Sequence, residues 1–208
     1  CIKNGACELQ AMAREYGIDV PNFKSSHGDV QHEPFNAHPF LSYDPGLCIQ
    51  CQRCISTCAK ATGRHALSLE RNGARVYVKV PFGEGWENSL CESCGNCAQA
   101  CPTGALTIKR RKDYREWEVK KVRTTCPHCA TGCQMDLYVK DGKIVDVQGA
   151  DGPSNHNLLC VKGRSGSFDF VDCDARIRYP LIKNKETGEF ERATWDEALN
   201  LVASKFSE

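Results

Sequence analysis

Two segments of this chain alternate apolar and polar residues around a tight turn. The turn of the first segment is Asn72-Gly73, and that of the second is Asp141-Gly142. Such pairs favour the two-residue turns of β-hairpins, so each segment predicts a hairpin. The alternating apolar residues are Leu69, Val76, Val78 and Val80 in the first segment, and Leu137, Val139, Ile144, Val145 and Val147 in the second.

Helical patterns occur near both ends of the sequence. Residues 8–16 are good helix formers, and Gly17 is a plausible stop. Residues 178–181 read as an extended segment and 184–188 as a polar turn, after which Thr194 to Glu197 matches a capping box. The helix that follows has an apolar face with little in this chain to pack on. We therefore expect the chain to continue, or to dock, beyond residue 208.

The region between these helices predicts a connector followed by a duplicated unit. Residues 21–47 are rich in Pro, His, Asn and Gly and predict little regular structure. Three histidines lie there, and as loop histidines they are expected to be exposed or hydrogen-bonded rather than metal ligands: His27, His32 and His38. Residues 48–108 repeat one pattern twice, a run of cysteines followed by a short apolar segment, at 66–69 and at 105–108.

Fourteen of the fifteen cysteines fall into spaced groups, and Cys173 stands apart. Two groups read C-x2-C-x2-C-x3-C, a spacing typical of iron–sulfur cubes. A third reads C-x2-C-x3-C with a distant fourth cysteine. The groups are Cys48, Cys51, Cys54 and Cys58; Cys91, Cys94, Cys97 and Cys101; Cys126, Cys129, Cys133 and Cys160; and, near the start, Cys1 and Cys7.

Disulfides and zinc are the alternative uses of these cysteines. Disulfides dominate in small secreted chains, whereas this chain has an odd cysteine count and no visible signal peptide. Structural zinc usually takes two separated pairs, which the triplets fit badly and the third group fits better. No large apolar core is evident between residues 20 and 130, so we expect metal binding to supply much of the folding energy there.

In two-cluster ferredoxins, the fourth cysteine of each run binds the other cluster. Applied here, this rule predicts two cubes that exchange their last ligands. Site 1 consists of Cys48, Cys51, Cys54 and Cys101, and site 2 of Cys58, Cys91, Cys94 and Cys97. Pro102 fits the bacterial form of the motif, and Ala59 departs from it.

The formal charge of +1 counts every cysteine as neutral. Three cubes, each carrying a net negative charge, would bring the chain to about −5. The basic residues between 109 and 123 are interrupted by acids, which favours a solvated linker or strand pair over a nucleic-acid patch. No apolar stretch is long enough to cross a membrane.

The third group resembles the iron–sulfur segment that opens the molybdopterin oxidoreductases, most of all the catalytic subunit of formate dehydrogenases. The resemblance rests on T-T-C-P-H-C-A-T-G-C, a hairpin, and L-L-C-V-K-G-R, with D-A-R-I-R-Y-P-L after them. It implies a third cube, at site 3, and a lysine between this cube and the pterin. Site 3 consists of Cys126, Cys129, Cys133 and Cys160, and Lys162 occupies the lysine position.

The start of the chain resembles the second half of a site with one histidine and three cysteines, H-x3-C-x2-C-x5-C. That site occurs in the large electron-transfer subunit of complex I, in iron-only hydrogenases and in soluble NAD-linked formate dehydrogenases. Cys1 and Cys7 would supply two of its four ligands. Among these relatives, only the formate dehydrogenases resemble all the modules in this order.

The resemblance implies an enzyme, an NAD-linked formate dehydrogenase in the cytoplasm, whose catalytic residues lie outside this segment. Formate is oxidised to CO2, or CO2 is reduced, at a molybdenum or tungsten bis-molybdopterin guanine dinucleotide in the rest of the protein. Three [4Fe-4S] clusters, with a fourth at Cys1 and Cys7, relay electrons. The implied partners are flavin/NAD-binding and 2Fe-2S subunits, with ferredoxin as a further electron carrier; nucleic acid is not expected.

The expected fold class is α+β, built from small iron–sulfur modules. Its predicted parts are the end of the histidine-containing module (1–20), a connector (21–47), a two-cluster ferredoxin-like domain (48–110), a linker (111–125), a β-rich 4Fe-4S domain (126–172) and the start of the pterin-binding region (173–208). Alternative functions are a polyferredoxin-type subunit without catalysis, and the matching region of a hydrogenase or a complex I-like NADH dehydrogenase. A zinc-stapled interaction module is a further alternative.

Overall fold

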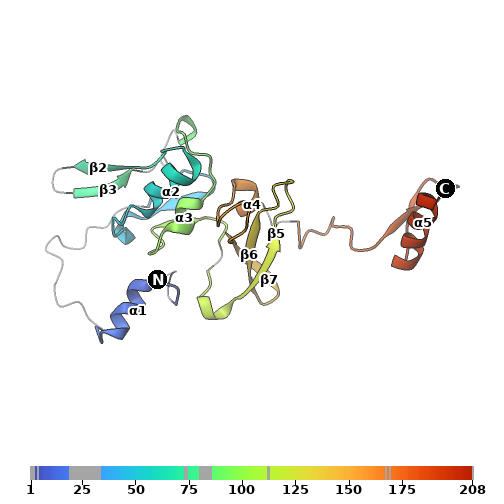
Figure 1. Ribbon diagram of the computed structural model, residues 1–208, viewed down its shortest axis with the longest axis horizontal. Helices are drawn as coiled ribbons and strands as arrows, with labels where there is room; N and C mark the ends of the chain where they lie inside the picture. The colour runs from blue at the N-terminus through green and yellow to red at the C-terminus, as the bar shows by residue number, and fades with distance from the viewer. Residues whose placement is uncertain are drawn as a thin grey trace. The chain divides into compact units, whose positions relative to one another are not determined.

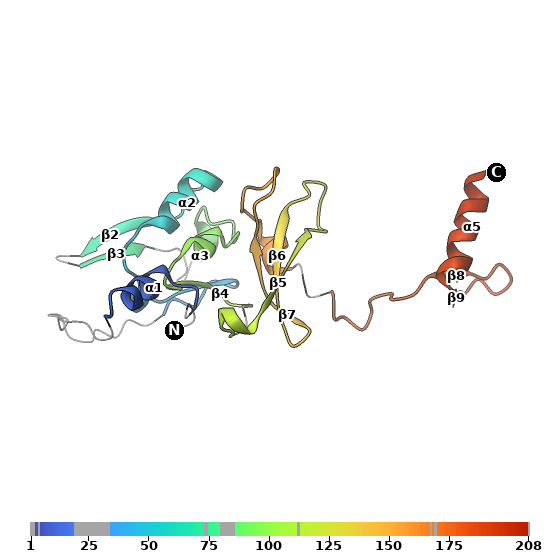
Figure 2. The same cartoon turned by 60° about the horizontal axis from the view of Figure 1, so that its bottom comes forward.

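The computed structural model describes residues 3, 5–18, 34–72, 75–79, 86–111, 113–166, 168 and 170–207. The chain divides into two compact units, Cys1–Phe168 and Asp169–Glu208, and each is described by itself. The first unit contains three groups of elements: an N-terminal helix, a ferredoxin-like module and a three-stranded sheet (Figures 1 and 2).

The N-terminal helix α1, Glu8–Glu15, begins directly after Cys7. Gly17 lies two residues beyond the helix and has a φ of +63°, which side-chain-bearing residues rarely adopt and which ends the helical path. The helix predicted over residues 8–16 is therefore confirmed.

The ferredoxin-like module places helices α2, Arg53–Thr62, and α3, Asn96–Ala100, side by side (Figure 1). Two small antiparallel sheets accompany them. Their strands are β1, Leu41–Tyr43, with β4, Leu106–Ile108, and β2, Ser68–Asn72, with β3, Arg75–Lys79. Single 3-10 turns lie at Pro45–Leu47 and Trp86–Asn88. The first predicted hairpin is confirmed as β2 and β3; its Gly73 and Val80 lie outside the described residues.

Cysteine sulfurs form part of the core of this module. Cys54, Cys97 and Cys101 are buried together with aliphatic and aromatic side chains, which include Leu41, Tyr43, Leu67, Val78, Leu106 and Ile108. The expectation of a small apolar core agrees with this composition. Cysteines that are predicted metal ligands therefore occupy positions that a larger domain would fill with leucine or valine.

Strand β1 differs from the sequence-based expectation. Residues 21–47 predicted little regular structure, yet β1 lies within them and pairs along its length with β4. Three residues are too few to show alternation, and the partner strand comes more than sixty positions later in the sequence. The pairing therefore could not be recognised from the local pattern.

The three-stranded sheet consists of β5, Lys120–Thr125, β6, Gln134–Lys140, and β7, Lys143–Gly149, in the order β5-β6-β7. A 3-10 turn, Glu116–Glu118, precedes it, and the short helix α4, Val161–Ser165, follows it. Asp141 and Gly142, between β6 and β7, have φ of 50° and 75°. The two-residue hairpin turn that an Asp-Gly pair favours requires positive φ at both of its central residues. The second predicted hairpin is therefore also confirmed.

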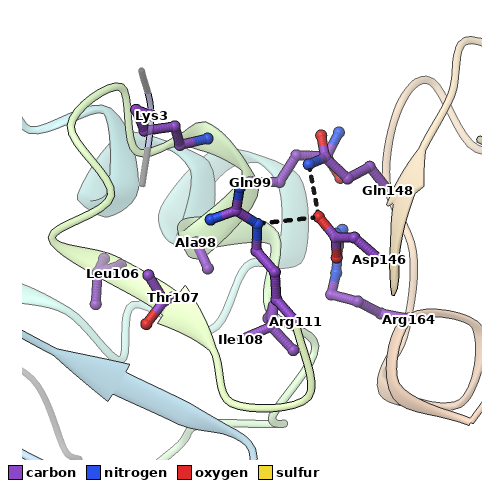
Figure 3. Close-up of a pocket in the computed structure, with 10 residues that line it drawn as sticks. All are labelled: Lys3, Ala98, Gln99, Leu106, Thr107, Ile108, Arg111, Asp146, Gln148 and Arg164. Carbon is purple, nitrogen blue, oxygen red and sulfur yellow. Dashed lines mark hydrogen bonds and ion pairs between the residues drawn. The ribbon is translucent and has the colours of Figure 1, made fainter. Parts of the chain in front are cut away.

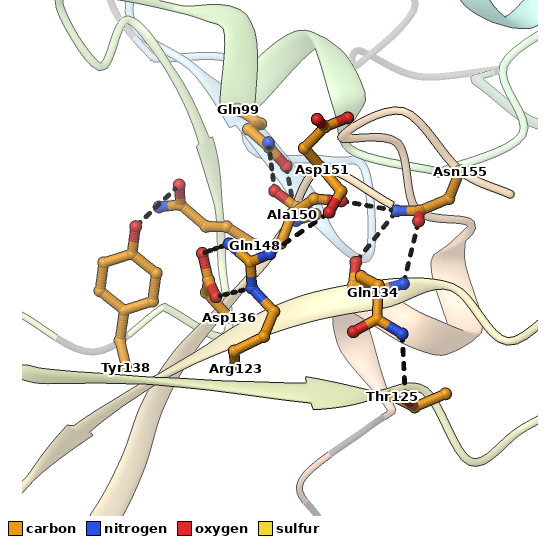
Figure 4. A network of polar contacts seen from close by, with 11 residues as sticks. Gln99, Arg123, Thr125, Gln134, Asp136, Tyr138, Gln148, Ala150, Asp151 and Asn155 are labelled. Atoms are coloured by element: carbon orange, nitrogen blue, oxygen red, sulfur yellow. Dashed lines mark hydrogen bonds and ion pairs between the residues drawn. The ribbon is translucent and has the colours of Figure 1, made fainter. Parts of the chain in front are cut away.

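Asn155 fixes the segment between this sheet and α4 (Figure 4). Its side-chain amide donates hydrogen bonds to the carbonyl oxygens of Gln134, Ala150 and Leu158 at 2.9–3.0 Å. Its side-chain oxygen accepts from the backbone N–H of Gln134 at 2.9 Å. One buried side chain therefore holds three backbone segments together.

The second unit is a hairpin followed by a helix. Strands β8, Leu181–Lys183, and β9, Phe190–Arg192, are antiparallel, and α5 covers Trp195–Ser207. Thr194 and Glu197 bond reciprocally, with the Thr194 N–H donating to the Glu197 carboxylate at 2.7 Å, so the predicted capping box is confirmed. Within this unit the apolar face of α5 is exposed, including Leu199, Val202 and Phe206.

None of the helices that the described residues form has both the length and the apolar character needed to cross a lipid bilayer.

Replacing Asn155 with Ala should lower the free energy of unfolding by about 2–3 kcal/mol, because buried backbone groups lose their partners. Denaturant unfolding of the metal-loaded chain, followed by circular dichroism, measures this change. Asn88→Ala, at an exposed position of the 3-10 turn Trp86–Asn88, is the matched control and should change stability by less than about 0.5 kcal/mol. Equal losses in the two variants would contradict this role of Asn155.

Candidate iron–sulfur sites

The first two cysteine groups are carried by loops with the same backbone conformation. The residues two and four positions after the first cysteine of each loop have positive φ: Gln50 (57°) and Gln52 (61°) in one loop, Ser93 (59°) and Gly95 (73°) in the other. α2 and α3 each begin directly after the second of these residues. The internal repeat seen in the sequence is therefore also a repeat of backbone geometry, which curls each loop before its helix starts.

One cavity of the ferredoxin-like module is lined by all four predicted ligands of site 1, together with Tyr43, Val78 and Leu106. Burial, together with the charges of Cys101, Cys48 and Cys51, raises the pKa of Cys54 to about 11. Cys101 acts on Cys54 although it belongs to the other sequence run. The loop that carries Cys48, Cys51 and Cys54 and the last cysteine of the second sequence group, Cys101, therefore line the same cavity.

A second cavity is lined by all four predicted ligands of site 2, together with Leu41, Thr62 and Leu67. Cys97 is buried, which raises its pKa strongly, and the charges of Cys94, Cys91, Cys54 and Cys58 add to this effect. Burial also raises the pKa of Cys91, with further contributions from Cys94 and Cys58. Cys58 thus faces the second loop, as the exchange of ligands predicted.

The residues that line both cavities fit a cluster with four thiolate ligands. Thiolates packed this closely in an apolar core repel one another, and bound iron would offset that repulsion. Among the described residues, no three Cys, His, Asp or Glu side chains are close enough to bind a single metal ion. A cube separates its four thiolates further than one ion does, so the two observations agree. Iron binding at these sites stays a prediction.

Several hydrogen bonds reach the sulfur atoms. The backbone N–H of Ala66 donates to Cys58 Sγ at 3.4 Å, and the Thr103 hydroxyl lies 3.7 Å from Cys101 Sγ. Donors directed at cluster sulfurs and ligand thiolates stabilise negative charge and thereby raise the reduction potential. These residues are therefore suited to adjust a bound cluster.

The sequence predicted His38 to be an exposed or hydrogen-bonded loop histidine, and the structure shows it hydrogen-bonded but buried beside site 2. It is fully buried, and its Nδ1 accepts hydrogen bonds from the backbone N–H groups of Phe40 and Leu41 at 3.1 and 3.0 Å. The proton therefore sits on Nε2, which lies 3.2 Å from Ser93 Oγ and 3.9 Å from Cys91 Sγ. Burial, with the charge of Lys109, lowers the pKa of His38 to about 4, so the ring is a neutral donor beside site 2.

The third cysteine group also converges. Burial raises the pKa of Cys133, and the charges of Cys126, Cys129 and Cys160 raise it further. These three cysteines act on Cys133 because all four predicted ligands of site 3 lie close to one another. The backbone N–H of Cys126 donates to the Cys133 carbonyl at 2.8 Å and closes the loop. Cys129 and Cys160 are exposed, so site 3 is more open than the two ferredoxin-like sites.

The remaining predicted residues are placed as follows. Lys162 is exposed on α4, and its charge contributes to a lowered pKa of Cys129, for which hydrogen bonds with Thr131 are the main cause. Cys7 is half-buried at the start of α1, whereas Cys1 lies outside the described residues, as do His27 and His32. The partial fourth site therefore stays a prediction. Cys173 is exposed in the second unit, away from the three groups in sequence.

Polar side chains of α3 join the ferredoxin-like module to the third group. The Gln99 amide oxygen accepts from the Gly149 N–H at 2.9 Å, and its nitrogen donates to the Gly149 carbonyl at 3.0 Å (Figure 4). Asn96 makes the equivalent pair of bonds to the carbonyl and N–H of Leu159, at 3.0 and 3.1 Å. Each side chain thus pairs with a backbone segment as another strand would, and Leu159 directly precedes Cys160.

Paired cysteine variants test the exchange of ligands. Cys51→Ala with Cys101→Ala should remove about four irons, since both residues serve one cube, whereas Cys51→Ala with Cys58→Ala should remove about eight. Iron analysis and EPR of the purified chain measure the difference. Cys173→Ala is the control and should lose none. The reverse order of losses would assign each cube to its own sequence run.

Comparison with known protein families gives three matches in chain order. Residues 39–107 match the NADH-quinone oxidoreductase subunit 3 ferredoxin-like domain. Residues 119–169 match the molybdopterin oxidoreductase Fe4S4 domain, and residues 176–208 match the molybdopterin oxidoreductase family. The first two segments contain the cysteines of sites 1 to 3, so the matches agree with a ferredoxin-like and an Fe4S4 module at these positions.

Individual relatives agree with this assignment. A protein of Rhizobium meliloti named as a subunit of NADH-quinone oxidoreductase is 35% identical over 95% of this chain, and a Staphylococcus aureus protein named "Putative formate dehydrogenase" is 29% identical over 98%. This chain spans 23% and 24% of their lengths. A crystal structure of NAD+-reducing [NiFe]-hydrogenase in its H2-reduced state covers 52% of this chain, and this chain covers 46% of it, at 29% identity and a TM-score of 0.43, which is too low to support an argument.

The three matched segments follow one another in sequence order, and the cysteines of the first two converge in the structure. The chain is therefore similar, in turn, to a ferredoxin-like domain, to the Fe4S4 domain of the molybdopterin oxidoreductases and to part of the molybdopterin oxidoreductase family model.

Proposed function

We propose that this chain is the electron-transfer region of a formate dehydrogenase. In this proposal, [4Fe-4S] clusters relay electrons between a molybdenum or tungsten pterin site outside residues 1–208 and a partner subunit that binds flavin and NAD. The reaction is the oxidation of formate to CO2, or its reverse, in the cytoplasm. The observation that carries the proposal is the convergence of two cysteine quartets on two cavities, followed in the same chain by an Fe4S4 segment and a molybdopterin oxidoreductase segment.

The residues of the chain would hold and adjust these clusters. Cubes, when bound, supply one-electron chemistry within a range of potentials that the protein sets by burial, charge and hydrogen bonding. The core of the ferredoxin-like module buries Cys54, Cys97 and Cys101. His38 and Ala66 direct N–H groups toward cysteine sulfurs of site 2. Site 3 has two exposed cysteines and a lysine nearby, which suits the end of the relay that faces another redox group.

A second candidate function is the corresponding region of a complex I-like NADH dehydrogenase. The R. meliloti relative is named a subunit of NADH-quinone oxidoreductase, and the ferredoxin-like match carries the same enzyme name. In this role the same clusters would accept electrons that originate from NADH, and the pterin region would not act on formate.

Anaerobic preparation of the full-length protein with its partner subunits distinguishes these functions. We expect about 12 irons per chain, or about 16 with a fourth cube at Cys1 and Cys7, a brown colour and EPR signals after reduction. Formate should reduce the clusters, and NAD should then reoxidise them. Cluster reduction by NADH but not by formate would favour the second candidate. Zinc in place of iron, without visible absorption, would overturn both.

Replacing Lys162 with Met should slow cluster reduction by formate about 10- to 100-fold, because the side chain is proposed to lie between site 3 and the pterin. Stopped-flow absorbance of the full-length enzyme measures the rate. Iron content and cluster signals should stay unchanged, and dithionite should still reduce all clusters. Lys143→Met, an exposed position at the start of β7, is the control and should have no effect. An unchanged rate with formate would remove Lys162 from the relay.

A further inference from the structure

Arg164 is the largest fully buried side chain of the described residues, with 2% of its surface exposed. It lies on α4, four residues beyond Cys160. A buried guanidinium is unusual, because removing a charge from water is costly unless other groups compensate it. The surroundings of this side chain therefore require an explanation that packing alone does not give.

The hydrogen bonds of Arg164 join two cysteine loops. Its side-chain Nε donates to the carbonyl oxygen of Cys94 at 2.9 Å, and its backbone N–H donates to the carbonyl oxygen of Cys160 at 3.1 Å. Cys94 belongs to site 2 and Cys160 to site 3. A single residue thus contacts the ligand loops of two proposed clusters.

Asn96 completes this connection. Arg164 Nη2 donates to Asn96 Oδ1 at 2.7 Å, and the same oxygen accepts the N–H of Leu159, the residue before Cys160. Gly95 lies between Cys94 and Asn96, and a Cβ there would be 2.5 Å from Arg164 Cδ and 2.5 Å from Ile108 Cδ1. The loop of site 2 therefore has room for the arginine only because this position is glycine.

Among the described residues, no carboxylate is hydrogen-bonded to the guanidinium of Arg164. Both acceptors of its guanidinium among the described residues are uncharged oxygens. Arg164 lines a cavity together with Asp146 and Arg111, which pair with each other at 3.5 Å (Figure 3). Tyr114 also donates a hydrogen bond to Asp146, at 2.8 Å. Burial lowers the pKa of Arg164, while the negative charges of Asp146, Cys94, Cys97 and Cys160 oppose that effect. A guanidinium nevertheless remains charged at neutral pH.

We propose that Arg164 is a positioning residue that couples site 2 to site 3: it fixes the two ligand loops to each other and raises the reduction potentials of both clusters. This inference rests on the proposed function, since it requires clusters at both sites. Arg164 itself gains or loses no electron or proton. Its fixed positive charge stabilises the additional negative charge that either cluster carries when reduced.

Arg164→Gln in the full-length complex tests the charge. At a given potential, the ratio of reduced to oxidised cluster should fall about tenfold at sites 2 and 3, which is about 59 mV for a one-electron couple. EPR-monitored redox titration measures this shift. Site 1, whose ligands Arg164 does not contact in the described structure, should keep its potential. Arg123→Gln is the matched control, because it removes the same charge from an exposed pair with Asp136.

Two further variants separate charge from packing. Arg164→Lys keeps the charge and loses the forked hydrogen bonds, so its potentials should stay close to those of the unchanged protein while its stability falls. Asn96→Asp keeps the arginine and places a negative charge beside it, so the potentials at sites 2 and 3 should fall as they do in Arg164→Gln. If Arg164→Gln fails to assemble, the potentials of Asn96→Asp still test the proposal.

The outcomes distinguish this proposal from the proposed function. Iron content and EPR signals of the unchanged protein test the clusters, and their absence would overturn both proposals. If the clusters are present but Asn96→Asp and any assembled Arg164→Gln protein keep normal potentials, only the role of Arg164 is refuted. Equal shifts at all three sites would also refute it, because they would reflect a general loosening of the fold.

Discussion

The repulsion among closely packed thiolates governs the first unit of this protein. Its small core contains sulfur atoms where larger domains have aliphatic side chains, and the burial of Cys54 and Cys97 makes their ionisation unfavourable without a compensating cation. The hydrophobic effect alone stabilises such a module weakly, since few large side chains are buried. In the proposed function, metal binding would supply both stability and electron transfer, so substitution of the ligands would not separate the two.

The module boundary is held by polar groups rather than by an apolar interface. Gln99 and Asn96 each bond to both the N–H and the carbonyl of one residue beyond the ferredoxin-like module. Directional bonds of this kind fix distance and orientation more narrowly than side-chain packing does. Narrow control matters for clusters in a relay, because the rate at which an electron passes between them depends steeply on their separation.

Local sequence signals predicted much of the structure. The helix α1, the strand pairs β2-β3 and β6-β7, and the capping box at Thr194 depend on residues close in sequence, and all are present. The cysteine spacing also anticipated which sulfurs share a cavity. Features made by distant residues were missed: β1 has its partner at β4, His38 faces Cys91, and Arg164 reaches Cys94. No local pattern encodes these contacts, and a lone histidine or arginine looks like any surface residue.

The short helix α4 has a consequence for how this region can change in evolution. Cys160 stands at its N-terminal cap and Arg164 one helical turn later, so both groups follow from a single stretch of backbone. Inserting or deleting one residue between them would rotate the guanidinium by about 100° around the helix axis. The interval from Cys160 to Arg164 should therefore tolerate changes of residue type at exposed positions, but not changes of length.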